Sequence, residues 1–370
     1  MSDIQQEIRG RAGLITLNRP RALNALSLAM VRDLTAILLE WADHSAIDLV
    51  AVRGMGKSAS EPSGAAPFGA FCAGGDIRFF HAAALAGDPA LEDFFTEEYA
   101  LNHLVHRFPK PYVVFMDGIV MGGGMGLAGH GAANALRIAT ERTQMAMPET
   151  NIGLFPDVGG GWFLARCPGR IGEYLALTGL TIGGADALAA GLADSVLPAS
   201  DLPGLWDSLG RPGALGLANL RGRSPGSAHQ ALETHRAQID HYFGLPDLPA
   251  IVSALEASAD DWARETAGVL RQRSPLMLHV VLEQVRRART MSLADELRME
   301  RGMVRHCFHL RPARDSETVE GIRALAVDKD RSPRWNPARI EDVGPQRVAA
   351  FFESPWPAHA HPLRDLVGNV

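Results

Sequence analysis

The segment Tyr112–Gly126 reads YVVFMDGIVMGGGMG, and the prediction of the fold starts from it. Its first part, Tyr112–Met116, is aromatic, β-branched or otherwise apolar, which is typical of a buried strand. The glycines Gly122–Gly124 follow that strand and lead into a predicted helix. A buried strand, a glycine-rich turn and a helix in this order favour an α/β layered fold.

The same order of elements occurs upstream in FCAGGDI, residues Phe71–Ile77. Here paired glycines lie where a predicted strand gives way to a helix that follows Asp76. Units of two strands and a helix recur up to about Val196, although the spacing does not give the strand order. One more helix is predicted to be capped at Ser27 and another to start near Asp88. The other predicted strands are Ile4–Arg9, Leu14–Leu17, Leu49–Val52, Ala135–Thr140 and Gln144–Met147.

Changes in composition divide the chain into two predicted parts, an α/β core over residues 1–210 and a helical region over 211–370. Residues 54–70 are rich in Gly, Ser, Pro and Ala, which predicts a surface insertion outside the core. Residues 211–227 are rich in Gly, Pro and Arg and are predicted to be a linker. Apolar residues three and four apart then predict helices over Pro249–Ala257, Asp260–Gln272, Leu276–Arg289 and Leu293–His309.

The whole-chain composition limits the partners and the compartment. The chain has 370 residues, 46% of them hydrophobic, and a net charge of −6, which argues against nucleic acid as a partner. No apolar run approaches the roughly 20 residues that cross a bilayer, and the N-terminus has no signal pattern. The cysteines Cys72, Cys167 and Cys307 are far apart and have no metal-type spacing. We therefore expect a cytoplasmic protein with no membrane partner.

Three short motifs match known signatures without the context that those signatures need. The glycine pattern of 124–129 resembles a dinucleotide fingerprint, but the next strand does not end in the acidic residue that binds the ribose. The sequence GKS at 56–58 lacks the first glycine of a P-loop. The sequence GRSPG at 222–226 matches a nucleophile elbow, yet Pro225 has no NH for an oxyanion hole.

Two histidine pairs could be read as metal ligands. His103 and His106, and likewise His306 and His309, lie three residues apart on predicted helices. Neither pair has a plausible third ligand nearby, so surface histidines are the favoured interpretation. We expect no metal site.

The glycine segments 74–75 and 122–124 are better placed than these motifs. A helix N-terminus offers free NH groups and the positive end of the helix dipole, and glycine allows a ligand oxygen to approach the backbone. Either segment alone is explained by tight helix packing. Two segments at equivalent points of a repeated unit favour a shared site for an anion or an oxyanion.

A third segment, residues 147–161, contains two carboxylates in apolar surroundings. Glu149 and Asp157 lie eight residues apart in MPETNIGLFPDVGGG, between prolines and glycines. They could be helix caps, which are common. A desolvated carboxylate beside a hydrolysable carbonyl is instead a general base or nucleophile with a raised pKa. The sequence pattern alone leaves both interpretations open.

Taken together, these segments resemble the crotonase (enoyl-CoA hydratase/isomerase) superfamily, and within it the 3-hydroxyisobutyryl-CoA hydrolase branch. The resemblance covers nearly the whole chain. The long form GLFPDVGGG and the segment Asp328–Asp330 are more specific than the glycine clusters. The other segments that carry it are Leu17–Pro20, Ala22–Leu26, FCAGGDI, Glu97–Tyr99, Lys110–Pro111, MGGGMGL, Ala146–Thr150 and Glu320–Ala324.

The resemblance implies a spiral of ββα units and a set of site residues. The thioester oxygen would bind the NH groups of Gly75 and Gly123, and Glu149 and Asp157 would be the catalytic pair. Glu98 and Gly123 would line the substrate site. Arg21, which replaces a frequent lysine and keeps its charge, would lie near the adenosine and phosphates of CoA. The other substrate-binding residues implied are Ala22, Leu23, Ala73, Asp76 and Ile77.

One position separates the reactions of the superfamily. Enoyl-CoA hydratases use two glutamates across the double bond, one of them just after the triple glycine. In this chain that position is Gly126, whereas Glu149 matches the other glutamate. Hydration of a double bond therefore loses one acid/base group and is disfavoured.

The implied activity is hydrolysis of an acyl-CoA thioester, most specifically 3-hydroxyisobutyryl-CoA to 3-hydroxyisobutyrate and CoA in valine catabolism. Glu149 would be base or nucleophile, and Asp157 would recognise the substrate hydroxyl or transfer a proton. The alternatives are an enoyl-CoA isomerase or hydratase and a catalytically silent CoA-binding protein. CoA is part of the substrate, so no separate cofactor is expected. Relatives in the superfamily are often trimers or hexamers, but the extended helical C-terminal region could cover the surface used for assembly, so whether this chain forms such a homo-oligomer stays open.

Overall fold

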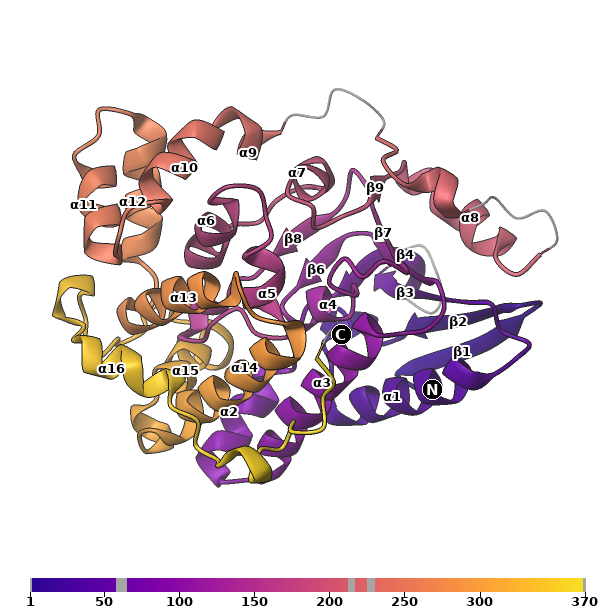
Figure 1. The fold of residues 1–370 in the computed structure, drawn as a ribbon, viewed down its shortest axis with the longest axis horizontal. Coiled ribbons are helices and arrows are strands. Elements are labelled where there is room, and N and C mark those ends of the chain that lie inside the picture. Colours follow the sequence, from indigo (N-terminus) through magenta and orange to yellow (C-terminus); the bar gives the residue numbers. More distant parts are fainter. Residues whose placement is uncertain (1, 58–64, 212–216, 225–229, 369–370) are drawn as a thin grey trace. The chain divides into compact units, whose positions relative to one another are not determined.

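The strands predicted around the two glycine segments belong to one mixed sheet (Figure 1). They are β1 (Ile4–Arg9), β2 (Ala12–Leu17), β3 (Leu49–Lys57), β4 (Ala65–Cys72), β5 (Tyr112–Met116), β6 (Ile119–Met121), β7 (Ala135–Ala139), β8 (Gln144–Ala146) and β9 (Ser195–Val196). β2, β3, β5, β7 and β9 form one run of parallel neighbours, and β4, β6 and β8 form another. The antiparallel pair β3–β4 joins the two runs, and β1 pairs antiparallel with β2.

The predicted repetition of two strands and a helix is confirmed by this pairing. Each of the successive strand pairs β3–β4, β5–β6 and β7–β8 contributes its first strand to one run and its second strand to the other. Connections between parallel strands need a crossover, which the intervening helices supply. The spacing in the sequence could not give this order, because it depends on contacts between distant strands.

The computed structural model describes residues 2–57, 65–211, 217–224 and 230–368. Contacts group them into two compact units, each built from separate stretches of the chain. Unit 1 (Met1–Gly75, Leu101–Ala146 and Thr181–Thr234) contains the sheet, and unit 2 (Asp76–Ala100, Met147–Leu180 and His235–Val370) is mainly helical. The two units interleave along the sequence. The division into two domains with a single boundary after residue 210 stays a prediction.

Much of the segment 54–70 is sheet, so its prediction as a surface insertion is wrong. β3 continues to Lys57 and β4 begins at Ala65, while the residues between them lie outside the described part of the chain. A Cβ at Gly54 would lie 2.1 Å from the carbonyl oxygen of Ala70. The glycine therefore reflects the close approach of two strands, and composition alone could not distinguish this from a loop.

Helices pack on the sheet of unit 1 through apolar side chains. The ring of Trp206 on α8 (Leu202–Ser208) lies edge-on to Phe115 of β5, with ring centroids 5.5 Å apart. A Cβ at Gly13 would lie 2.4 Å from the indole ring of Trp41, which belongs to α1 (Leu28–Asp43). As predicted, Ser27 caps α1, and its side chain accepts a hydrogen bond from the NH of Met30. The other helices in this unit are α4 (Gly123–Gly126), α7 (Gly184–Ala189) and α9 (Ala231–Thr234).

Unit 2 is mainly helical and includes the first part of α3, which continues into unit 1. The helices predicted in the last third of the chain are present, each within one or two residues of the predicted bounds. The helices are α2 (Ile77–Ala86), α3 (Ala90–His106), α5 (Gly160–Leu164), α6 (Ile171–Thr178), α10 (Arg236–Phe243), α11 (Leu248–Glu256), α12 (Asp261–Arg271), α13 (Pro275–Ala288), α14 (Leu293–His309), α15 (Glu317–Ile322) and α16 (Pro345–Ala349).

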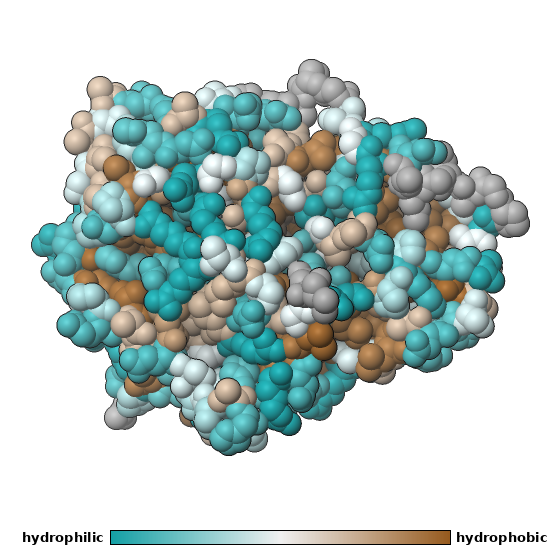
Figure 2. Space-filling model, in the orientation of Figure 1, coloured by the Kyte–Doolittle hydropathy of each residue, from teal (hydrophilic) through white to brown (hydrophobic). Residues whose placement is uncertain are grey.

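The surface and the helices give no sign of a membrane-spanning element. Hydrophilic side chains cover much of the face drawn in Figure 2, with apolar residues between them. In the part of the chain that the structure describes, none of the helices combines the length and the apolar character needed to cross a bilayer.

Candidate active site

The two glycine segments meet at one edge of the sheet in unit 1. β4 and β6 are parallel neighbours, with Cys72 paired to Val120 near their carboxyl ends. The chain leaves β4 into Gly74 and Gly75 and leaves β6 into Gly122 and Gly123. Because parallel strands end at the same edge, both glycine turns start side by side.

Gly74 lies against the other glycine turn. A Cβ at this residue would lie 3.1 Å from the carbonyl oxygen of Met121 and 3.4 Å from the nitrogen of Gly123. Its φ of +97° is also unfavourable for residues with a side chain. Gly123 is the first residue of α4, whose first NH groups have no partner within the helix. Gly74 therefore lets the two turns pack closely against each other.

The segment Arg21–Leu23 lies next to the first of these turns. Arg21 is exposed in the short 3-10 helix Pro20–Ala22, and the carbonyl oxygen of Leu23 accepts a hydrogen bond of 3.0 Å from the NH of Ala73. Leu23 and Ala73 are therefore in contact, as residues of a shared binding surface must be. The exposed guanidinium group of Arg21 comes two residues earlier in the chain.

Asn24, which we did not single out from the sequence, fixes this arrangement. Its buried amide nitrogen donates to the carbonyl oxygens of Ala70 and Phe71, each at 3.0 Å, and to that of Met55 at 2.9 Å. Its side-chain oxygen accepts from the NH of Arg19 at 2.8 Å. One side chain therefore ties the 3-10 segment to the end of β4. Its position in the Asn-Ala-Leu run was the available signal.

Glu98, Glu149 and Asp157 form a buried carboxyl cluster in unit 2. Glu98 is on α3, Glu149 begins the 3-10 helix Glu149–Ile152, and Asp157 precedes α5. The exposed fractions are 2% for Glu98 and 6% for each of the other two. Each is close enough to at least one of the others to shift its ionisation.

Burial dominates the ionisation of this cluster. Burial raises the pKa of Glu98 well above its ordinary range, and the charges of Asp157 and Glu149 raise it further. The pKa of Glu149 is raised by burial and then by the charge of Asp157. Burial also raises the pKa of Asp157 to about 7, although a hydrogen bond from Tyr99 opposes the shift. Asp157 can therefore take up and release a proton near neutral pH, which is what a general base or acid needs.

Two oxygens of the cluster lack a protein partner. Oε1 of Glu98 and Oε2 of Glu149 are buried and have no hydrogen-bond partner among the described residues. Buried polar atoms are nearly always paired, and exceptions are frequent where a ligand or water binds. The cluster therefore has acceptors left for a substrate hydroxyl or an attacking water.

Tyr99 is a site residue that the sequence analysis missed. Its buried hydroxyl donates a hydrogen bond of 3.0 Å to Oδ2 of Asp157. This bond favours the ionised form of the carboxylate and fixes the direction of its oxygens. The adjacent Glu98 was noted through the family resemblance, which assigned a role to that glutamate and none to the tyrosine beside it.

Comparison with known proteins places this arrangement in a family. The model of the enoyl-CoA hydratase/isomerase family matches residues 12–352. The chain belongs to this family. It is 38% identical to the mitochondrial 3-hydroxyisobutyryl-CoA hydrolase of Gallus gallus, over 95% of this chain and 89% of that protein. It is 36% identical to the probable 3-hydroxyisobutyryl-CoA hydrolase 3 of Arabidopsis thaliana, over 95% and 92%.

Solved structures of the family share the fold of this chain. An enoyl-CoA hydratase from Rhodobacter sphaeroides is 39% identical and has a TM-score of 0.84, covering 96% of this chain and 98% of its own. A carnitinyl-CoA dehydratase from Mycobacterium thermoresistibile is 34% identical with a TM-score of 0.85, covering 99% of both chains. The predicted α/β crotonase fold and the resemblance to the hydrolase branch are confirmed.

Gly126 is the last residue of α4 and is buried. It offers no carboxyl group at the position where hydratases of the family, by the resemblance described above, use a glutamate. The carboxyl groups described here come from α3 and from the segment 149–157.

Asp76 and Ile77, which the resemblance placed at the substrate, begin a helix. The side chain of Asp76 accepts a hydrogen bond of 3.3 Å from the NH of Phe79, so it caps α2, and Ile77 is the first residue of that helix. Capping accounts for an aspartate here without a ligand. Their contact with substrate stays a prediction.

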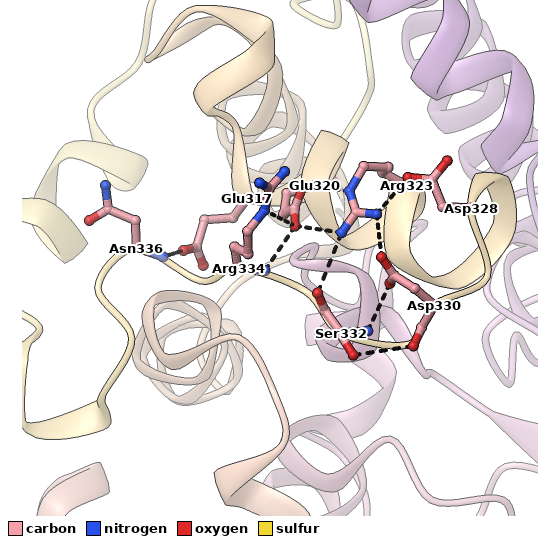
Figure 3. A network of polar contacts seen from close by, with 8 residues as sticks. All are labelled: Glu317, Glu320, Arg323, Asp328, Asp330, Ser332, Arg334 and Asn336. Atoms are coloured by element: carbon pink, nitrogen blue, oxygen red, sulfur yellow. Dashed lines mark hydrogen bonds and ion pairs between the residues drawn. The ribbon is translucent and has the colours of Figure 1, made fainter.

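The family-specific segment 328–330 is organised around one arginine (Figure 3). The guanidinium of Arg323 bonds to Asp328 and Asp330 at 2.6 Å each, and to Glu320 at 2.8 Å. The carboxylates of Asp328 and Asp330 are therefore paired with Arg323, and this structural role explains the acidic residues of the segment.

The rejected motifs stay without support in the described residues. No group of three or more histidine, cysteine or carboxylate residues there could hold a metal ion. Of the esterase-like segment 222–226, Pro225 and Gly226 lie outside the described part of the chain.

Proposed function

We propose that this protein hydrolyses an acyl-CoA thioester, with 3-hydroxyisobutyryl-CoA as the substrate. The observation that carries the proposal is the buried carboxyl cluster in which Glu149 and Asp157 interact and Asp157 titrates near neutral pH. The curated relatives that match over nearly the whole chain are named as 3-hydroxyisobutyryl-CoA hydrolases. The missing side chain at Gly126 supports hydrolysis over hydration.

Polarisation of the carbonyl is the first step of the proposed mechanism. The NH groups of Gly75 and Gly123 hold the thioester oxygen and stabilise the negative charge that develops on it. Removing one such donor from an oxyanion hole typically costs about 3 kcal/mol of transition-state stabilisation. The glycine turns support this role because they lie side by side and Gly74 has no room for a side chain.

Glu149 acts next, as a base or as a nucleophile. As a base it takes a proton from water, whose oxygen attacks the carbonyl carbon, and the C–S bond breaks as CoA leaves and is protonated. As a nucleophile it forms a mixed anhydride with release of CoA, and water then opens the anhydride to give the acid. Both routes need Glu149 ionised, and both give 3-hydroxyisobutyrate and CoA.

Asp157 and Glu98 contact the acyl group in this proposal. Asp157 accepts a hydrogen bond from the 3-hydroxyl or shares the proton transfer with Glu149. Burial raises the pKa of Glu98 well above its ordinary range, which favours the protonated form, and in that form Glu98 can donate a hydrogen bond to substrate. Arg21, Ala22, Leu23 and Ala73 bind the adenosine and phosphates of CoA, which the exposure of Arg21 supports.

Hydration or isomerisation of an enoyl-CoA is the second candidate, because solved relatives are named as a hydratase and a dehydratase. Wild-type protein incubated separately with 3-hydroxyisobutyryl-CoA and crotonyl-CoA distinguishes the two. We expect free thiol from the first and stable enoyl absorbance with the second. Loss of enoyl absorbance without thiol release would overturn the proposal. No reaction with either ester would favour a CoA-binding protein.

We propose further that the reaction occurs in the cytoplasm, within a homo-oligomer and without a cofactor. The described cysteines are free and buried, which supports a reducing compartment. The vertebrate relatives are named as mitochondrial proteins, so fractionation of the source cells is the relevant test. Activity that survives dialysis against a chelator would support the absence of a metal, and light scattering gives the oligomeric state.

A further inference from the structure

A second pair of buried carboxyl groups lies behind the loop that carries Asp157. Glu296 and Glu300 are four residues apart on α14, and both have an exposed fraction of 0%. They face Gln284 of α13, which is also fully buried. Burying carboxyl groups is costly unless they are paired, so the pair needs a structural or functional reason.

Glu300 holds the backbone that follows Asp157. Its Oε2 accepts a hydrogen bond of 2.8 Å from the NH of Gly159, and its Oε1 accepts one of 3.3 Å from the NH of Gly161. Gly159 precedes α5 and has no side chain to cap it, so Glu300 caps that helix from α14. The loop also contains Val158 at a φ of +57°, a conformation that persists only where surrounding contacts impose it.

Gln284 and Glu296 complete the support. The amide nitrogen of Gln284 donates to the carbonyl oxygen of Pro156 at 2.8 Å and to Glu300 at 3.0 Å. The backbone is thus held on both sides of Asp157. A Cβ at Gly161 would lie 2.4 Å from Oε1 of Glu296, so the glycine lets the pair approach the chain.

Burial raises the pKa of both carboxyl groups. The pKa of Glu296 rises to about 7, while hydrogen bonds from Glu300 and Gln284 oppose the shift. The pKa of Glu300 rises well above its ordinary range, because the charge of Glu296 and the hydrogen bond to it add to the effect of burial. Glu300 accepts from three N–H groups and Glu296 from one, so Glu300 makes most of the contacts that hold the backbone.

We propose that Glu300, supported by Glu296 and Gln284, is a positioning residue for Asp157: it fixes the loop Asp157–Gly161. The part of the inference that concerns turnover rests on the proposed hydrolase function. Glu300 does not touch the reacting atoms. It acts through the backbone that aims Asp157.

The first test needs no substrate. Hydrogen exchange of the peptide 157–164 is measured in wild type and in Glu300→Gln, Glu296→Gln and Glu173→Gln. Glu173 is a matched control because it is also fully buried in unit 2, where it pairs with Arg170 and Arg289. Faster exchange of this peptide in Glu300→Gln alone is expected, because an amide cannot accept both NH groups. Unchanged exchange in Glu300→Gln, or equal acceleration in Glu173→Gln, would overturn the proposal.

The second test is kinetic. Misplacing a catalytic group by about 1 Å costs roughly 100-fold, so we expect a 10–100-fold lower kcat with little change in KM for Glu300→Gln. Glu296→Gln leaves the hydrogen bonds from Gly159 and Gly161 to Glu300 in place, so its kcat should stay within about threefold of wild type. A kcat for Glu300→Gln as high as that of Glu296→Gln would contradict the assignment.

Should Glu300→Gln not fold, Gln284→Met removes only the donors, and unchanged exchange of 157–164 there would count against the proposal. If wild type hydrolyses no thioester, the proposed function fails, whereas the exchange result still decides whether Glu300 holds the loop.

Discussion

The hydroxyl of Tyr99 donates a hydrogen bond of 3.0 Å to Oδ2 of Asp157, and both side chains are buried. The bond links α3 to the loop before α5 and is the main protein contact that favours the ionised form of Asp157, against the effect of burial. The proton affinity of the carboxyl cluster is therefore set by a balance between desolvation and one phenol. That balance can be measured through the pH dependence of turnover and of stability.

The acid limb of the pH–rate profile should lie near neutrality. Burial raises the pKa of Asp157 to about 7 and that of Glu149 well above its ordinary range. Proton transfer to Asp157 requires its ionised form, so kcat should rise with pH through about 7. Rates of thiol release between pH 4 and 9 measure this. A limb between pH 4 and 5, the range of exposed carboxyls, would contradict the account.

Tyr99→Phe should move this limb to higher pH. The substitution removes a hydrogen bond to the charged form, worth about 1.5–3 kcal/mol, so the pKa of Asp157 should rise by about one unit or more. At pH 7 we expect kcat to fall about tenfold and to recover at alkaline pH. Tyr242→Phe is the control, since that tyrosine is half-buried on α10, where its ring contacts His241 and Trp262. If the acid limb of the pH–rate profile stays at the wild-type pH, the ionisation behind that limb is not that of Asp157.

Gly74→Ala should abolish most activity. A Cβ there would lie 3.1 Å from the carbonyl oxygen of Met121 and 3.4 Å from the nitrogen of Gly123, and the φ of +97° adds strain. Because the displaced turn carries a proposed oxyanion donor, we expect kcat to fall by about 100-fold or more. Gly191→Ala is the matched control, with a φ of +74° and no atoms within 4 Å of the new Cβ. Equal losses in both variants would point to backbone strain alone.

Asp157→Asn should stabilise the fold at alkaline pH and not at acidic pH. The folded-state pKa of Asp157, about 7, lies above its ordinary value of 3.8. A raised carboxyl pKa means that the folded state binds more protons, so its contribution is complete below pH 4 and is lost as pH rises through about 7. We expect a higher Tm than wild type at pH 8, with the difference shrinking towards pH 5. A Tm difference that is independent of pH would contradict the shift.

The sequence predicted the fold through local signals that the structure retains. The apolar run Tyr112–Met116, the cap at Ser27 and the glycine turns appear where expected, because each depends on residues close together in the chain. The prediction of the segment 54–70 as a surface insertion was wrong. Glycine is required there by the close packing of two strands, and a glycine-rich loop would have a similar composition.

The candidate site was predictable only in part. Glu149 and Asp157 were found because two carboxylates interrupt an apolar segment. Tyr99 and Glu300 were missed, although Glu296 and Glu300 at a spacing of four on the buried face of α14 were a usable signal. Their roles depend on contacts between α3, the Asp157 loop and α14, which are distant in sequence and cannot be inferred from spacing.

The central claim is that the buried carboxyls of this protein hydrolyse a CoA thioester. Its most direct test is the rate of free-thiol release from 3-hydroxyisobutyryl-CoA at pH 8 by wild type and by Glu149→Gln, with folding of both verified by circular dichroism. We predict one thiol released per ester consumed by wild type and a loss of at least about 1,000-fold in the variant. Equal rates in the two proteins, or consumption of the ester without thiol, would contradict the account.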